Sequence, residues 1–221
     1  MFRSPLTDYD TWACLTPGFL LLAAGDHVLR LGWIWRDTWT TVGAVFAIAC
    51  AYVVGQACAS LASLIIERGL VHRILKPPSV VLLDPDAGPK WAHRIFPNYY
   101  RSLPPPAPQR VYEKAEKAGV TQGSEALFQW AYSVAREKKT VAERLPVFLN
   151  QYGMARNSAF AVSICAALLA WSALADGRDA DWWWAAAAAA TAITMLFRFL
   201  KNYRLFTAEI YRHIAFEEPP T

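Results

Sequence analysis

The chain has 221 residues, of which 55% are hydrophobic, 14% aromatic and 18% charged, and its formal net charge is +4. This composition excludes a disordered chain, a fibrous repeat and a disulfide scaffold, and the modest charge does not indicate nucleic-acid binding. The mean hydropathy of +0.17 does not by itself distinguish a soluble protein from a membrane protein. The distribution of the apolar residues along the chain has to decide.

The N-terminal segment, residues 1–41, contains the least regular of four apolar runs. Trp12–Gly25 is too short to cross a membrane, but an extension to Trp35 gives a full span that carries Asp26 and Arg30. Tryptophans near both ends would mark the two interfaces. A re-entrant or surface-lying helix is the alternative, and we predict a span because an odd number of crossings would separate the termini.

Three further runs predict transmembrane helices. Val42–Ile66 is the clearest, because it has 25 residues and no formal charge, and Ser158–Ala175 and Trp182–Phe197 follow. The polar segment 67–157 holds most of the Lys and Arg residues, whereas the loop 175–181 is rich in Asp. The positive-inside rule therefore places the polar segment and both termini in the cytoplasm, as in an inner-membrane protein or an equivalent plasma-membrane topology.

The predicted fold is an all-α membrane protein with four transmembrane helices and a mainly helical cytoplasmic domain between the second and third. The predicted parts are the N-terminal segment with the first span (1–41), the second span (42–66), the cytoplasmic domain (67–157), the third and fourth spans (158–200) and a C-terminal helix (201–221). Within the domain we expect at most one small strand, a helix over Val111–Ala118, a helix capped by Ser124 and a capping box at Thr140–Glu143. The last of these would open a helix that passes Pro146 into the third span.

No recognised catalytic motif occurs in the chain, so we do not expect an enzyme. The four cysteines do not follow a zinc-binding spacing, and we expect no metal and no cofactor. An enzyme embedded in the membrane would require a converging cluster such as Asp26, His27 and His72.

Polar residues inside the spans form two helical faces. Steps of three and four residues align one set in the second span and another in the fourth, and polar groups in hydrocarbon turn toward protein or water. Helix packing is one interpretation, supported by the small residues Ala51, Gly55, Ala59 and Ser63, and a pore lining in an oligomer is the other. Asp26 would either pair with Arg30 one turn later or serve as a gate. The candidate pore or gating residues are Asp26, Arg30, Tyr52, Gln56, Ser60, Ser63, Thr191, Thr194 and Arg198.

Basic and aromatic residues alternate in the predicted cytoplasmic domain. Arginine beside stacking aromatic rings suits a phosphate or nucleotide, and it equally suits an anionic membrane surface. The candidate ligand-binding residues are Lys76, Arg94, Tyr99, Arg101 and Arg110.

Three short motifs resemble those of small bacterial membrane effectors from anti-phage defence, with the Hailong-type transmembrane effector as the nearest named example. The motifs are Tyr52-Val53-Val54-Gly55-Gln56, Tyr152-Gly153-Met154-Ala155-Arg156-Asn157 and Arg198-Phe199-Leu200-Lys201-Asn202-Tyr203-Arg204. The resemblance implies an oligomeric channel that is opened by a nucleotide signal and causes abortive infection. The expected partners are the lipid bilayer, other copies of the chain and, as a candidate ligand, a nucleotide second messenger. A non-conducting membrane anchor or regulatory subunit for a cytoplasmic partner is the alternative function.

Overall fold

A computed structural model describes residues 10–34, 36–120 and 123–216. Over these ranges the chain is helical, with 81% helix and no strand. The short apolar run Val80–Leu82, the candidate for the small strand, lies in helix α3 (Pro78–Val81) and at its C-cap. Pro78 suits this helix, because proline is favoured in the first helical turn. The all-helical class is confirmed, and the small strand does not occur in the described residues.

The chain divides into two compact units. Unit 1 comprises Met1–Glu67 and Asn150–Phe199, and unit 2 comprises Arg68–Leu149 and Leu200–Thr221. Unit 2 contains 16 of the 22 Lys and Arg residues and 10 of the 18 Asp and Glu residues, which leaves 6 and 8 in unit 1. Unit 2 is therefore basic (+6) and unit 1 slightly acidic (−2).

Three helical stretches are long and apolar enough to cross a membrane. They are Thr41–Val81, α7 (Lys139–Asp176) and α8 (Asp179–Phe216). Between 22% and 33% of the most apolar part of each stretch is buried within the chain. Most of their apolar surface is therefore left for lipid or for another protein to cover.

The first predicted span is shorter in the structure than in the sequence analysis. A π-helical segment, η1 (Asp10–Leu15), leads into α1 (Thr16–Leu29), and Ala13–Leu29 is a short apolar helix. The extension to Trp35 is wrong as a helix, because Arg30 takes a left-handed conformation (φ 56°) that ends α1. The backbone N–H groups of Trp33 and Ile34 then donate to the Asp26 carboxylate at 2.8 and 3.0 Å.

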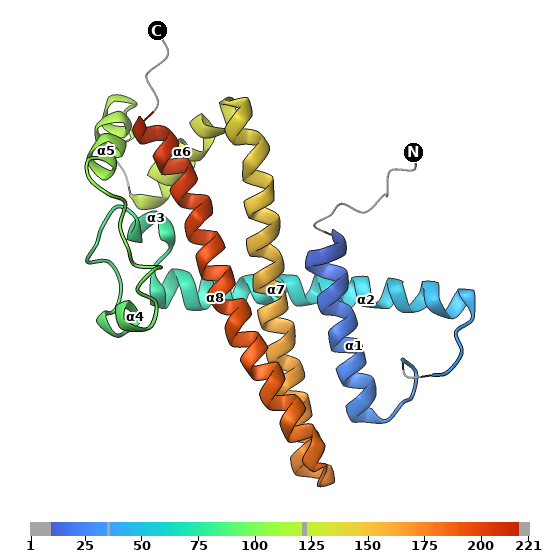
Figure 1. Cartoon of the computed structure of the whole chain (residues 1–221). Coiled ribbons are helices and arrows are strands. Elements are labelled where there is room, and N and C mark those ends of the chain that lie inside the picture. The colour runs from blue at the N-terminus through green and yellow to red at the C-terminus, as the bar shows by residue number, and fades with distance from the viewer. Residues whose placement is uncertain (1–9, 35, 121–122, 217–221) are drawn as a thin grey trace. The chain divides into compact units, whose positions relative to one another are not determined.

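Helix α1 lies along the part of α7 that belongs to unit 1. Asn157 Nδ2 donates to the Ala13 carbonyl at 2.8 Å, Cys165 Sγ donates to the Leu20 carbonyl at 3.5 Å and Arg30 pairs with Asp176 at 3.0 Å. The sequence separation stays at 144 to 146 residues across these pairs, so the two helices run in parallel. Figure 1 shows α1 beside α7, with α2 running across both rather than alongside them.

Helix α2 (Thr41–Ala62) contacts α1 through two glycines. Thr40 caps α2 by accepting from the Gly43 N–H at 3.1 Å. A Cβ added to Gly18 would collide with the Ala51 carbonyl, and one added to Gly55 would collide with the Cys14 carbonyl. Ala51 and Gly55, two members of the predicted small-residue row, thus lie where the α2 backbone meets the backbone of α1 and η1. The π-helical segment η2 (Ser63–Leu75) continues the helix beyond Ala62.

Unit 2 is built from short helices around the end of α8. These are α3, α4 (Lys90–Ile95), α5 (Ala107–Lys117) and α6 (Ser124–Glu137). Tyr211 is fully buried and its hydroxyl donates to the Ser79 carbonyl at 3.1 Å. Lys114 Nζ donates to the Ile214 carbonyl at 2.8 Å, which attaches α5 to α8.

Two predicted helix caps lie one and two residues away from their expected places. Gly123 is the N-cap of α6, so Ser124 is its first helical residue. α7 begins at Lys139, so Thr140 lies inside its first turn and not at the cap. The prediction that this helix passes Pro146 is confirmed, because α7 is continuous to Asp176.

Candidate functional site

A buried cluster of polar side chains joins the first segment, α2–η2 and α7 within unit 1. Glu67 forms an ion pair with Arg156, and the side chains are 19% and 10% exposed. Arg156 Nε also donates to Asn157 Oδ1 at 3.1 Å, and Ser63 donates to Glu67 at 3.4 Å. We call Ser63, Glu67, Arg156 and Asn157 the junction cluster.

Asn157 connects this cluster to two other segments. It is fully buried, its side-chain Nδ2 donates to the Ala13 carbonyl, and its backbone carbonyl accepts from Cys58 Sγ at 3.8 Å. Ala13 precedes Cys14, which lies at the glycine crossing described above. The ion pair and the closest helix crossing are therefore parts of one junction. Removal of one partner from such a pair leaves an uncompensated buried charge and typically costs about 3–5 kcal/mol.

A second cluster joins the C-terminal end of α1 to the α7–α8 turn. Asp181 is 3% exposed, accepts from the Ser172 hydroxyl at 2.5 Å and lies 3.0 Å from His27 Nε2. Arg178 lies 3.7 Å from Asp181 and 3.2 Å from Asp176, and Asp176 also holds Arg30. We call His27, Arg30, Ser172, Asp176, Arg178 and Asp181 the turn cluster. It attaches the end of α1 to the turn by several charged hydrogen bonds.

The structure places Asp26 and Arg30 differently from the sequence analysis. The expected Asp26–Arg30 pair does not form, because Asp26 bonds the two backbone N–H groups that follow α1 and Arg30 reaches across to α7. Asp26 is 3% exposed. Its carboxylate accepts hydrogen bonds from the backbone of the loop after α1 and so holds that loop against the end of the helix.

The other predicted pore residues remain on the two helices without contacting each other. Ser60, Thr191 and Thr194 are exposed, and each hydroxyl donates to the carbonyl four residues earlier, at 3.1, 2.9 and 2.9 Å. Tyr52 and Gln56 are half-buried and Arg198 is exposed. Among the described residues, no hydrogen bond joins the α2 face to the α8 face, and the pore assignment stays a prediction.

The predicted ligand-binding residues all lie in unit 2, in different settings. Tyr99 is 4% exposed and lies edge-on to Tyr100, with a 5.2 Å centroid separation, so its ring is not available to stack on a ligand. Lys76, Arg94, Arg101 and Arg110 are exposed, and the Arg110 guanidinium lies 5.5 Å from the Phe216 ring centroid. Tyr99 is therefore a structural residue, and the four basic residues remain candidates.

Two tyrosine hydroxyls hold the loop of unit 2 against the end of η2. Tyr99 and Tyr100 donate to the carbonyls of Lys76 and Leu75, both at 2.7 Å. Burial raises the pKa of both phenols above the ordinary value, and in Tyr99 the neighbouring Tyr203 and Tyr100 add to the rise. Both groups are therefore neutral donors at physiological pH.

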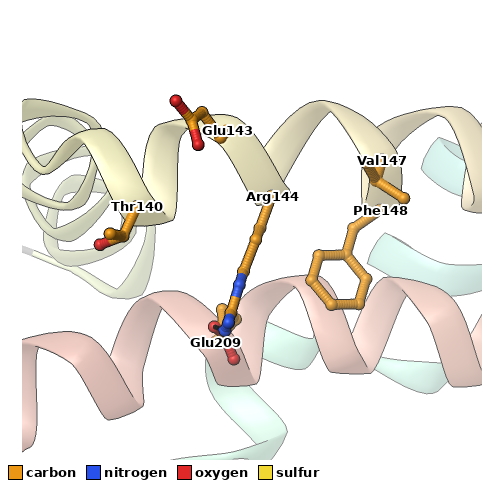
Figure 2. Close-up of a pocket in the computed structure, with 6 residues that line it drawn as sticks. All are labelled: Thr140, Glu143, Arg144, Val147, Phe148 and Glu209. Atoms are coloured by element: carbon orange, nitrogen blue, oxygen red, sulfur yellow. Dashed lines mark hydrogen bonds and ion pairs between the residues drawn. The ribbon is translucent and has the colours of Figure 1, made fainter.

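A groove of 490 Å³ lies between α7 and α8 in unit 2. Thr140, Glu143, Arg144, Val147, Phe148 and Glu209 line it. Figure 2 shows Arg144 reaching from α7 to Glu209 on α8, with Glu143 directed away from them. The Arg144–Glu209 distance is 3.3 Å and Arg144 is 71% exposed, so this pair contributes little to stability.

Arg156 and Asn157 stand in the sequence within the Tyr152–Asn157 motif and are not among the predicted site residues. The sequence feature that could have identified them is a charged and an amide side chain directly before an apolar run, because polar side chains at the edge of a membrane span often have a structural or functional partner. Ser172, Asp176, Arg178 and Asp181 were also missed, although the concentration of Asp in the short 175–181 loop was noted. No group of three or more His, Cys, Asp or Glu side chains in the described ranges is arranged to hold a metal ion.

Comparison with protein-family models, curated proteins and solved structures found no match to this chain.

Proposed function

We propose that this chain is an integral membrane effector that assembles with copies of itself into an ion-conducting or membrane-permeabilising pore. Ligand binding to unit 2 on the cytoplasmic side would control it. The exposed apolar surface of the three span-length helices supports the membrane location. The anti-phage role and the nucleotide ligand are supported by the motif resemblance alone.

The contacts within unit 1 support four crossings with both termini on one side. Ala13, Glu67 and Asn157 meet at the junction cluster, while the end of α1 meets the α7–α8 turn at the other end of the paired helices. The Trp33 and Phe46 rings are 6.1 Å apart, so α2 begins near the end of α1 that holds the turn cluster. Each of α1, α2, α7 and α8 then leads from one end of unit 1 to the other.

The α2–η2 helix is long enough to cross a membrane even when it is strongly tilted. Thr41–Glu67 is a helical path of 27 residues, which is about 40 Å at 1.5 Å per residue. Such a helix still covers a hydrocarbon layer of about 30 Å when it is tilted by about 40°. The acidic turn cluster would face outward and the basic unit 2 would face the cytoplasm, as the positive-inside rule requires.

The observation that carries the pore is Arg198 on the exposed face of α8. Thr191, Thr194 and Arg198 share this face, and the guanidinium has no ion-pair partner among the described residues, while both threonine hydroxyls are satisfied by their own helix. An arginine that faces hydrocarbon is costly and turns toward water, headgroups or protein. A second copy or a water-filled path between copies would supply those partners.

The test is current across a planar bilayer that contains the purified chain, with and without a panel of nucleotide second messengers. Arg198→Ala and Gln56→Ala should change the conductance. Ile193→Ala and Val53→Ala, which truncate exposed apolar side chains on the same two helices, should leave it unchanged. Silence with every ligand, from protein shown to be folded and inserted, would refute the pore.

A non-conducting anchor is the second candidate, and one observation favours it. The hydroxyls of Ser60, Thr191 and Thr194 are already bonded to their own helices, so these residues need no water and tolerate lipid or helix contact. Recovery of one soluble protein in a fixed ratio with the chain, together with no conductance, would support this function over the pore.

A further inference from the structure

Arg204, on the part of α8 that belongs to unit 2, has an unusual environment. Its Nη2 donates to the carbonyl of Arg101 at 2.6 Å, so the guanidinium is held against the loop that follows Tyr100. Its Nε is buried and has no hydrogen-bond partner. A buried donor without a partner is rare in folded proteins and often indicates a missing ion or water.

Two more arginines lie close to Arg204. Arg101 lies beside Arg204, because the Arg204 guanidinium bonds the Arg101 carbonyl, and Arg212 is eight residues, or about 12 Å, later on α8. Both carry a positive charge that opposes the charge on Arg204. No described acidic side chain forms an ion pair with any of the three, and Glu209, the nearest acid in sequence, contacts Arg144 on α7. Among the described residues, these three arginines therefore lack an ion-pair partner.

The backbone of the loop that carries Arg101 is held in place by neighbouring contacts. The hydroxyls of Tyr99 and Tyr100 bond the last carbonyls of η2, and Arg101 follows them directly in the chain. Tyr203, next to Arg204, lies with its hydroxyl 3.4 Å from His72 Nε2. These contacts hold the backbone beside Arg101 and Arg204 and do not neutralise either charge.

We propose that Arg101, Arg204 and Arg212 form a binding site for the phosphate group of an anionic ligand. Guanidinium groups present paired N–H donors that match phosphate oxygens, and the bound anion would offset the repulsion among the three charges. Arg204 is five residues beyond Phe199, the last residue of unit 1, which is about 7.5 Å along the helix. A phospholipid headgroup at the cytoplasmic surface and a water-soluble phosphate ester both fit this position.

The site does not depend on whether the chain conducts ions, and only its lipid source rests on the proposed membrane orientation. Binding is therefore measured directly, on the full chain in a neutral detergent. One arm adds short-chain phosphatidylglycerol with phosphatidylcholine as the neutral lipid, and the other adds pyrophosphate and adenosine monophosphate. Native mass spectrometry counts the retained lipid, and microscale thermophoresis measures the dissociation constants.

The test variants are Arg101→Gln and Arg212→Gln, whose side chains are exposed and whose loss should not prevent folding. The control is Arg136→Gln, an exposed arginine on α6 whose guanidinium lies 5.5 Å from the Tyr132 ring centroid. Each test variant should weaken binding about tenfold or more, because a charged hydrogen bond contributes about 1.5–3 kcal/mol. The control should bind as the wild type does.

The outcomes separate the two sources. Selective loss of phosphatidylglycerol in the test variants identifies a lipid headgroup site, and selective loss of pyrophosphate or adenosine monophosphate identifies a soluble phosphate site. Absence of binding by all probes would overturn the proposal. Equal weakening by Arg136→Gln would also overturn it, because binding would then follow the overall charge of unit 2 and not this site.

Discussion

The crossing of α1 and α2 predicts a large and position-specific effect of adding one methyl group. Gly18→Ala and Gly55→Ala each place a Cβ against a backbone carbonyl of the other helix. A carbonyl cannot rotate away as a flexible side chain can, so the helices must separate by about 1 Å or more to regain ordinary contact. A gap of that size forfeits about a quarter to a half of the dispersion energy of the facing atoms.

The expected loss is about 1–3 kcal/mol of unfolding free energy for each variant, as for other overpacked sites. For a chain of this size that corresponds to a fall in Tm of about 2–10 °C. Gly25→Ala is the matched control on α1, because its added Cβ meets nothing within 4 Å. This control should be unchanged or slightly more stable, since alanine favours a helix by about 0.5–1 kcal/mol over glycine.

The cysteines provide the assay. Cys14 and Cys58 are buried at the junction and form no disulfide, so a thiol-reactive fluorophore reports the exposure of these side chains as the detergent-solubilised protein is heated. If Gly18→Ala and Gly55→Ala unfold at the same temperature as Gly25→Ala, the close backbone crossing is not present and the arrangement of α1 and α2 has to be revised.

Three further predictions concern buried polar groups. Arg156→Ala should cost about 3–5 kcal/mol because it strands the Glu67 carboxylate, whereas Glu67→Met with Arg156→Met should recover most of that loss; equal losses in the thiol unfolding assay would contradict the pairing. Asp26→Ala should cost about 1–3 kcal/mol, because two backbone N–H groups lose their acceptor, and Asp26→Asn should cost less in the same assay. Burial raises the pKa of Tyr99, so this phenol ionises at a lower pH in the unfolded chain than in the folded chain. The free energy of unfolding should therefore fall above about pH 10, and this contribution should be constant below that pH. Tyr99→Phe should weaken that alkaline loss in denaturation curves measured between neutral and high pH, and an unchanged slope would show that the phenol is not buried.

Local patterns in the sequence predicted the helices themselves. The length of the apolar runs determines which helices can cross a membrane, and a run such as Val42–Ile66 needs no tertiary contact to be recognised. The same holds for the continuity of α7 through Pro146 and for the row of small residues on α2. The first span was misjudged at its end, because an Asp side chain that caps a following loop cannot be told by spacing from one that pairs with an arginine four residues later.

The polar partners were decided by the tertiary structure alone. Glu67 meets Arg156 across 89 residues of sequence, Asn157 meets Ala13 across 144 and His27 meets Asp181 across 154. No local periodicity encodes such pairs, because each helix specifies only which of its residues share a face and not which other helix that face will meet. The sequence by itself determined the helical class, the span-length segments and the charge contrast between the polar domain and the turns. The folded chain determined that a glycine crossing and a buried ion pair lie at one junction, since both depend on how closely the backbones of different helices approach each other.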